Sequence, residues 1–392
     1  MAATDIRVSC NSPARLLLLA LALLLAPLQA MASVLPADRA DVMYHQYDGG
    51  GMTIDGPSVL VRKAVRDDVS LSANYYVDQV SSASIDVITT GASKYSEERT
   101  EFTLSGDYLL NKTIISGGYT GSSENDYEAN TYYFGIAQDF FGDLSTLSLN
   151  YSYGADDVFN ATDEAFEDKV RRQNYQFSWS QVMTKNLVMN FNYNIITDEG
   201  YLNNPYRSVR FLINDEDPSQ GYAFQQEVYP RTRTSHAMAA RGRYFLPYRA
   251  AFSFEYRRFN DTWEVNAYNL QVGYTHPIRE NWTLDVKYRF YSQDEAEFYS
   301  DLFPEINYQN YLARDKELSE FTSDNFGVAL GYEFKPAWAS WVEKASANIA
   351  LDFMEFDYNN FRDLRVQGVP AGSEPMYNFD ATVTRIFISA WF

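Results

Sequence analysis

Polar and apolar residues alternate strictly in many segments of this chain. In residues 69 to 78 the odd positions are apolar and nearly all the even ones are polar, and residues 101 to 110 and 147 to 153 repeat the pattern. A two-residue period places successive side chains on opposite faces of an extended strand. The sequence therefore predicts many strands, each with one apolar and one polar face, and no helical segment between them.

Short and long links alternate between these strands. Short ones include residues 66–68 and 141–143, and long ones include 155–172, 197–230 and 293–323. This alternation is typical of the turns and loops of outer-membrane barrels, and the strand count is about 16, within a range of about 14 to 18. Lipid cannot satisfy backbone polar groups, so an all-β chain in a membrane must close its sheet. We therefore predict an all-β fold, a transmembrane antiparallel up-and-down β-barrel.

The first predicted strand allows two interpretations. Residues 33–52 include Gly49, Gly50 and Gly51, and part of this segment, residues 41 to 48, alternates like a strand. Alternatively, the segment threads the lumen as a plug, which would lower the strand count by one or two.

The composition agrees with a membrane barrel. The mean hydropathy is only −0.37, yet 16% of the residues are aromatic. Only every second strand residue of a barrel faces lipid, and aromatic side chains gather at the two interfaces. The alternative is a soluble sandwich of two sheets. The residues expected in the aromatic belts include Trp282, Tyr288, Trp338, Trp341 and Trp391.

The beginning of the chain resembles an export signal. Arg7 and Arg15 precede the apolar run Leu16 to Leu25, and Ala30-Met31-Ala32 offers small residues for signal cleavage. We predict a secretory signal peptide over residues 1–32 and an outer-membrane barrel over residues 33–392. The single cysteine, Cys10, falls within the signal, so the barrel has no disulfide and no thiolate metal site.

The end of the chain carries a second targeting signal. Its last strand places Ile386, Ile388, Ala390 and Phe392 two apart and finishes on an aromatic residue, like the recognition strand that the barrel-assembly machinery reads in bacterial outer-membrane proteins. We therefore expect this machinery, outer-membrane lipid and lipopolysaccharide as partners. A net charge of −20 argues against nucleic acid as a partner.

Longer stretches of the chain resemble the bacterial family known as domain of unknown function 3570 (DUF3570). The resemblance extends from about Tyr44 to Phe392, and it implies an outer-membrane barrel. It implies no reaction, substrate or catalytic residue. The stretches that carry it are YDGGGMTIDGPSVLVRK, VSLSANYYVDQVSSASIDVITTGAS, ITDEGYLNNPYRSVRF and RFYSQDEAEFYSDLF.

The polar faces of the later strands predict a charged lumen. About sixteen strands enclose a space that side chains alone do not fill. The inward positions are expected to carry Arg231, Arg233, Arg241, Arg243, Glu255, Arg257, Asp285, Lys287 and Arg289. One interpretation is a strip that attracts anions or zwitterions in a pore, where charged side chains set selectivity. The other is a network of ion pairs that only stiffens the wall.

We consider three functions. A porin-like passage for small polar or anionic solutes fits the charged lumen best. The alternatives are a non-conducting scaffold or sheath for a periplasmic or surface partner, and a transporter of apolar ligands. In the long loops, the acidic run from Asn214 to Pro218 suggests either a calcium site or, preferably, a solvated surface, because it lacks the spacing of a calcium loop.

Enzymatic activity is not predicted, although hydrolysis is kept as an alternative. The only histidines are His45, His236 and His276, and the sequence shows no orienting partner for any of them. Ser235 and His236 are adjacent, so they would point to opposite faces of a strand. His276 is expected in a short turn. There is no Cys-x-x-Cys-His motif for haem attachment, and no cofactor or metal site is predicted.

Overall fold

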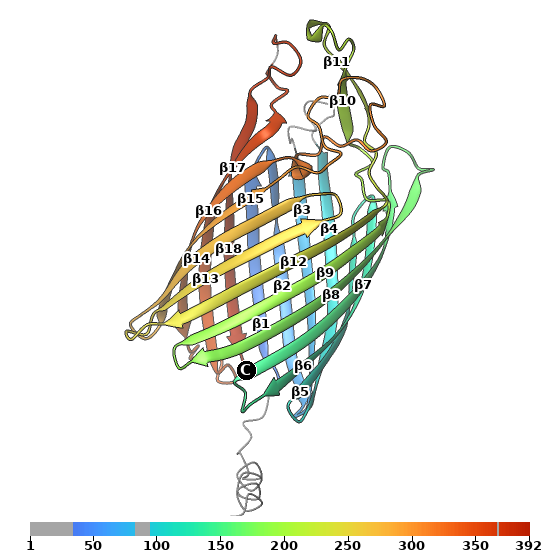
Figure 1. Cartoon of the computed structure of the whole chain (residues 1–392). Helices are drawn as coiled ribbons and strands as arrows, with labels where there is room; N and C mark the ends of the chain where they lie inside the picture. The colour runs from blue at the N-terminus through green and yellow to red at the C-terminus, as the bar shows by residue number, and fades with distance from the viewer. Residues whose placement is uncertain (1–33, 83–94, 367) are drawn as a thin grey trace, which may run out of the picture.

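The chain folds into one closed, antiparallel β-barrel of sixteen strands (Figure 1). The computed structural model describes residues 34–82, 95–366 and 368–392, so the predicted signal peptide lies outside the described residues. Neighbours in the sheet follow the chain order, except that β12 pairs with β9, because β10 and β11 form a separate hairpin. The predicted fold class and strand count are confirmed.

The sixteen barrel strands are β1 (Arg39–Gly49), β2 (Met52–Arg66), β3 (Val69–Ser82), β4 (Tyr95–Leu110), β5 (Thr113–Ser123), β6 (Tyr127–Phe140), β7 (Ser145–Phe159), β8 (Glu167–Thr184), β9 (Leu187–Gly200), β12 (Thr232–Phe245), β13 (Ala251–Asp261), β14 (Asn266–Ile278), β15 (Trp282–Gln293), β16 (Phe321–Phe334), β17 (Lys344–Arg362) and β18 (Met376–Trp391).

The first strand closes the barrel. β1 pairs with β2 on one side and with β18 on the other, so that Tyr44 faces Pro57 and Ile386 in the two ladders. Every residue of β1 has a partner in both neighbours. The alternative in which this segment is a lumenal plug is therefore wrong.

The two ends of the barrel differ in their links. At one end, here called the turn end, the links run from two residues, as at 111–112, to nine residues at 335–343. At the opposite end, the loop end, the segments between barrel strands include 201–231 and 294–320. Both the start of β1 and the end of β18 lie at the turn end (Figure 1).

Several strands extend further towards the loop end than the sequence pattern predicts. The link expected over 155–172 shrinks to residues 160–166, because β7 and β8 continue pairing. Asp157 and Lys169 face each other in this extension and form an ion pair of 2.7 Å. Outward polar residues of this kind end the apolar alternation without ending the strand.

The outer face of the barrel is apolar over a continuous band, as a transmembrane barrel requires. The exposed side chains that form it include Leu71, Leu104, Phe134, Leu149, Phe177, Leu270, Phe326, Phe353, Ile386 and Ile388. Trp282 and Tyr288 lie on this face, and Trp338 and Trp341 are exposed in the turn 335–343. Trp391 belongs instead to the opposite alternation, with Lys344 Nζ 4.5 Å from its ring centre. Among the described residues, no helix has the length and apolarity to span a membrane.

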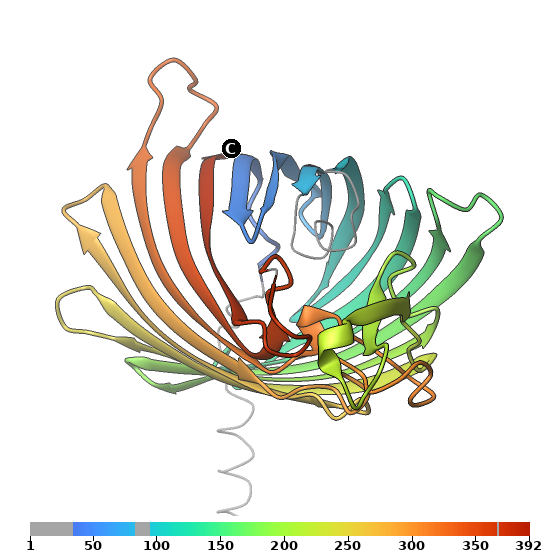
Figure 2. The same ribbon diagram turned by 90° about the horizontal axis from the view of Figure 1, so that it is seen from above.

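Segments at the loop end pack together into what we call the loop cap, residues 201–231, 294–320, 363–366 and 368–375. It contains β10 (Ser208–Leu212), β11 (Tyr222–Gln226) and the short 3-10 helices η1 (Pro218–Gln220) and η2 (Lys316–Leu318). Isolated bridges join Phe211 to Phe303 and Val228 to Leu312. Seen from the loop end, β10, β11 and the neighbouring links gather over one side of the barrel (Figure 2).

Candidate functional site

A hollow in the inner wall brings together five of the nine predicted lumenal residues. Its volume is about 660 Å³, and we call it the basic recess. Strands β9 and β12 to β15 form its wall. Its lining comprises Val188, Asn190, Arg241, Gly242, Arg243, Phe245, Ser253, Phe254, Glu255, Arg257, Asn269, Gln271 and Arg289.

Strand register explains why these side chains meet. Arg241 pairs with Glu255, Glu255 with Gln271, and Gln271 with Arg289, which makes one row across β12 to β15. Arg257 lies opposite Asn269 in the next row towards the loop end. Directly opposed residues place their Cβ atoms only about 5 Å apart, so the rows form one polar surface.

The recess has more positive than negative charge. Arg241 Nε donates to Glu255 at 2.5 Å, which neutralises one guanidinium. Arg243, Arg257 and Arg289 have no carboxylate within 4.0 Å among the residues that the structure describes. Arg289 Nε is buried without a hydrogen-bond partner. Three guanidinium groups thus retain free donors, and guanidinium is the side chain best shaped for carboxylate or phosphate.

The other predicted lumenal residues lie outside the recess and are mostly paired. Arg231 precedes β12 and binds Asp168 at 2.8 Å, and Arg233 binds Asp261 at 2.5 Å. Asp285 accepts a hydrogen bond from Thr275. Around this part of the wall, the interpretation as a stiffening ion-pair network describes the contacts well.

Lys287 belongs to a charged cluster that the sequence prediction missed in part. Lys287 Nζ lies 2.7 Å from Asp352, and Arg385 binds the same carboxylate at 2.5 Å. The sequence holds a signal for it, because the alternation that puts Ile386 on the outer face also puts Arg385 on the inner one. The alternation does not give the strand register, so it cannot show that Lys287, Asp352 and Arg385 lie at the same level along the barrel axis.

Charge is distributed unevenly around the lumen. The basic recess and Lys287 lie on β12 to β15, whereas the inward positions of β3 to β9 carry mainly carboxylates. Those carboxylates include Asp78, Glu101, Asp107, Asp139, Asp156 and Asp198, with Arg99 and Arg172 among them. A solute in the lumen therefore meets a field directed across the barrel, from the basic wall to the acidic one.

The last strand has the exposure expected of its predicted role. Ile386 and Ile388 are exposed on the outer face. Phe392 lies near Trp341, with ring centres 5.7 Å apart, and Lys63 Nζ lies 5.0 Å from the Phe392 ring centre. Recognition of this strand by the assembly machinery stays a prediction.

Comparison with known protein families assigns the chain to one family. Residues 88–352 match the model of a family described as a protein of unknown function, DUF3570. The chain belongs to the DUF3570 family. The match starts later than the resemblance at about Tyr44, but it includes the stretches over residues 196–211 and 289–303.

Solved structures share the barrel of this DUF3570 protein. A structure titled bacterial polysaccharide outer membrane secretin aligns with a TM-score of 0.51 at 8% identity, over 91% of this chain and 99% of that chain. OpdK of Pseudomonas aeruginosa, solved with vanillate, aligns with a TM-score of 0.43 at 11% identity, over 92% and 100%. At 8% identity the likeness to the first of these structures concerns the fold only. No curated protein matches the sequence.

The histidines of the DUF3570 barrel all have partners, so the expectation that none has an orienting partner is wrong. His45 Nε2 lies 2.7 Å from Asp78, while His236 and His276 each pair with a tyrosine hydroxyl at 2.9 Å. His276 lies within β14 and not in a turn. Among the described residues, the hydroxyl that contacts His45 is that of Tyr76, at 3.0 Å, and no serine or threonine hydroxyl does so.

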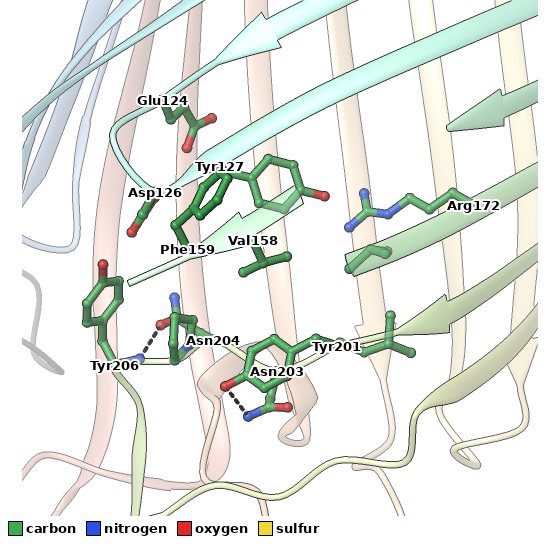
Figure 3. Close-up of a pocket in the computed structure, with 13 residues that line it drawn as sticks. Glu124, Asp126, Tyr127, Val158, Phe159, Arg172, Tyr201, Asn203, Asn204 and Tyr206 are labelled. Atoms are coloured by element: carbon green, nitrogen blue, oxygen red, sulfur yellow. Dashed lines mark hydrogen bonds between the residues drawn. The ribbon is translucent and has the colours of Figure 1, made fainter. Parts of the chain in front are cut away.

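A second hollow of about 250 Å³ lies at the loop end, between the β5–β6 link and the start of the loop cap (Figure 3). Tyr127, Tyr201 and Tyr206 contribute rings to it, and Asn203 Nδ2 donates to the Tyr201 hydroxyl at 3.0 Å. The site combines aromatic surface with amide groups. It is separate from the basic recess and shares no lining residue with it.

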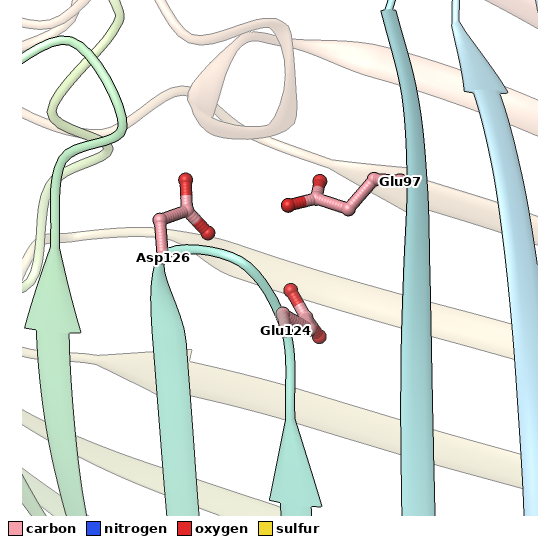
Figure 4. A group of neighbouring side chains, drawn as sticks. All are labelled: Glu97, Glu124 and Asp126. Atoms are coloured by element: carbon pink, nitrogen blue, oxygen red, sulfur yellow. The ribbon is translucent and has the colours of Figure 1, made fainter.

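Three carboxylates meet beside this second hollow. Oxygens of Glu97, Glu124 and Asp126 lie within 4.8 Å of one another (Figure 4). Burial raises the pKa of Glu124 and Asp126 adds to the shift, while Arg99, 3.5 Å away, opposes it. Carboxylates alone do not define a cation site, and we assign no metal here. The acidic run from Asn214 to Pro218 is solvated, and its Asp217 caps η1.

Proposed function

We propose that this protein is an outer-membrane barrel that passes small polar and anionic solutes, with the basic recess as the place where anions are attracted. The observation that carries the proposal is the set of three guanidinium groups, on Arg243, Arg257 and Arg289, that no carboxylate neutralises among the described residues. A network that served only to stiffen the wall would pair its charges, as Arg233 does with Asp261.

The lining also favours polar solutes over apolar ligands. Charged and amide side chains dominate the recess, and a charged group in a wet lumen costs little while it raises the local concentration of counter-ions. The turn end, where β1 begins and β18 ends, would face the periplasm. The apolar band would contact membrane lipid and lipopolysaccharide, after insertion by the barrel-assembly machinery.

One observation favours a scaffold role as a second candidate. The loop cap is folded, yet it exposes large apolar side chains at Ile213, Phe224, Ile306 and Tyr308. Large apolar side chains exposed on a folded surface are typical of partner-binding sites. A barrel that binds a partner through this surface predicts co-purification of that partner, whether or not the lumen conducts.

The proposal is tested by conductance of the purified protein in planar bilayers, with the reversal potential measured in a potassium chloride gradient. We expect steady current steps with a preference for chloride. Replacing Arg243, Arg257 and Arg289 together by alanine should reduce that preference. Arg231→Ala is the matched control, because its guanidinium is bound to Asp168 outside the recess. A silent barrel, or a chloride preference equal in all three proteins, would contradict the proposal.

A further inference from the structure

We infer that the basic recess selects hydroxylated anions, the class that includes sugar acids and sugar phosphates. The inference rests on the proposed function and names the solute class that the same site recognises. It follows from two kinds of group that meet there, guanidinium and side-chain amide.

The guanidinium groups specify an anion with several oxygen atoms. Arg257 lies on β13 and Arg289 on β15, on the two sides of β14. Arg243 lies on β12, nearer the turn end of the same wall. Each planar guanidinium offers parallel donors that match two oxygens of a carboxylate or a phosphate. The unpartnered Nε of Arg289 is a buried donor that such an oxygen would satisfy.

The amides specify hydroxyl groups beside that anion. Asn269 is only 6% exposed, yet its side chain makes no hydrogen bond with any described residue, and neither does that of Gln271. The polar atoms of both amides are accessible from the recess, so a ligand bound there can use their free donors and acceptors. Because an amide both donates and accepts, the matching ligand group is one that does both. A hydroxyl group fits that requirement.

The arrangement places the two kinds of group side by side. Arg257 lies directly opposite Asn269, and Arg289 lies directly opposite Gln271, so each arginine has an amide neighbour across the ladder. A simple anion would satisfy only the arginines, and a neutral sugar would satisfy only the amides. A sugar ring with one carboxylate or phosphate satisfies both sets from one position.

The size and surface of the recess agree with this class. Its volume of about 660 Å³ lies in the range of about 300 to 1,000 Å³ that small-molecule sites occupy. Apolar lining is limited to Val188, Phe245 and Phe254, and Phe254 exposes its ring on the outer face. Phe245 is then the aromatic ring of this lining on the inner face, and it lies at the turn end of β12, away from Arg257 and Asn269. An aromatic anion held by Arg257 would therefore find little stacking surface, which favours a hydroxylated ligand.

The test is block of the chloride current by added solutes in the same bilayer. We compare glucuronate and glucose 6-phosphate with acetate, glucose and benzoate. Glucuronate or glucose 6-phosphate should block at a concentration at least about tenfold lower than acetate, glucose or benzoate. The stronger of the two anionic sugars distinguishes carboxylate from phosphate as the preferred group.

Two variants connect the block to the named residues. Asn269→Leu should weaken block by the anionic sugar about tenfold and leave the reversal potential unchanged, since no charge is removed. Asn74→Leu, an inward amide on β3 on the far side of the barrel, is its control and should keep wild-type block. Arg257→Lys, which retains the positive charge, should weaken the block because it loses the planar pair of donors.

The outcomes separate this inference from the proposed function. A chloride-preferring channel that acetate or benzoate blocks as strongly as glucuronate would overturn the inference and leave the proposed function intact. If the barrel does not conduct, calorimetry of glucuronate binding to the detergent-solubilised protein decides the inference alone. Binding that Asn269→Leu weakens supports it, and the absence of binding by both anionic sugars overturns it.

Discussion

His45 on β1 reaches Asp78 on β3 across the strand that separates them, with Nε2 2.7 Å from Oδ1. The Tyr76 hydroxyl lies 3.0 Å from the same nitrogen, and its ring stacks on the histidine at 4.9 Å. Gly56 of β2 lies opposite His45 in register. Because Gly56 has no side chain, the histidine can cross it. The ladder between β2 and β3 is interrupted at Gly56 and Pro57, so the pair bridges a break in the wall.

Gly56→Ala should destabilise this part of the barrel. A Cβ atom at Gly56 would lie 1.9 Å from the Val77 carbonyl oxygen, and backbone cannot rotate away as a side chain does. We expect a loss of about 1 to 3 kcal/mol, typical of overpacking. The measurement is the temperature at which the folded barrel converts to the slower-migrating unfolded form on gels.

Gly117→Ala is the matched control, since the nearest atom to its added Cβ is 3.8 Å away. If Gly56→Ala and Gly117→Ala unfold at the same temperature, close approach at Gly56 does not limit stability, and the break between β2 and β3 tolerates a side chain.

The barrel itself could be predicted because its physics is local. Alternation of side chains such as Leu71 and Ser72 defines two faces, and lipid then requires closure. The ends of strands are harder to predict, because Asp157 and Lys169 place charges at outward positions where the earlier part of each strand has apolar residues. Polar strand extensions outside the lipid look like loops in sequence.

The candidate site could be predicted only in part. Alternation shows that Arg241 and Arg243 face the lumen, but only register shows that Glu255 lies opposite Arg241 and Ser253 opposite Arg243. A shift of two residues in the register of β12 against β13 would therefore place Glu255 opposite Arg243 and leave Arg241 without it. Contacts such as His45 with Asp78 join non-adjacent strands, and no periodicity reports them.

Glu255→Gln should increase the anion preference of the lumen. The carboxylate of Glu255 neutralises Arg241 at 2.5 Å, so the variant adds a fourth unmatched guanidinium to the recess while glutamine keeps the shape of the side chain. We expect the reversal potential to shift further towards that of chloride. Glu264→Gln, which removes an exposed carboxylate from the β13–β14 link, is the control. Equal shifts of the reversal potential in the two variants would mean that the recess does not determine ion selectivity.

The loop cap contains a buried ion cluster in which Asp301 contacts three arginines, and Glu374 also binds one of them, Arg210. Asp301 binds Arg210 at 2.5 Å, Arg314 at 3.0 Å and Arg362 at 3.3 Å, and Arg210 is fully buried. Asp301→Asn removes the charge from this cluster, and breaking a buried pair costs about 3 to 5 kcal/mol. We expect the segment 294–320 to become sensitive to protease in the folded barrel.

The control for that variant is Asp217→Asn. Asp217 is exposed and caps η1 by accepting a hydrogen bond from Ser219. Asparagine caps a helix equally well, so the loop cap of this variant should stay resistant to protease. Loss of resistance in both variants would show that the loop cap is generally labile. Retention of resistance in Asp301→Asn would show that the arginines do not need its charge.

Acid should loosen the loop cap, but only below the ordinary range of aspartate. Burial alone would raise the pKa of Asp301, yet Arg314 and Arg210 lower it below its usual value. A carboxyl whose folded pKa is lowered stabilises the fold above the unfolded pKa, and that contribution is lost as pH falls through the folded value. We therefore expect pepsin to leave residues 294–320 intact at about pH 4 and to cut them at about pH 2. In Asp301→Asn the difference in cutting between the two pH values should be smaller, because Asp301 no longer titrates and only Glu374 remains as a carboxyl partner of Arg210. A wild-type cap that pepsin already cuts at the higher value would show that Asp301 titrates with a pKa that the arginines do not lower.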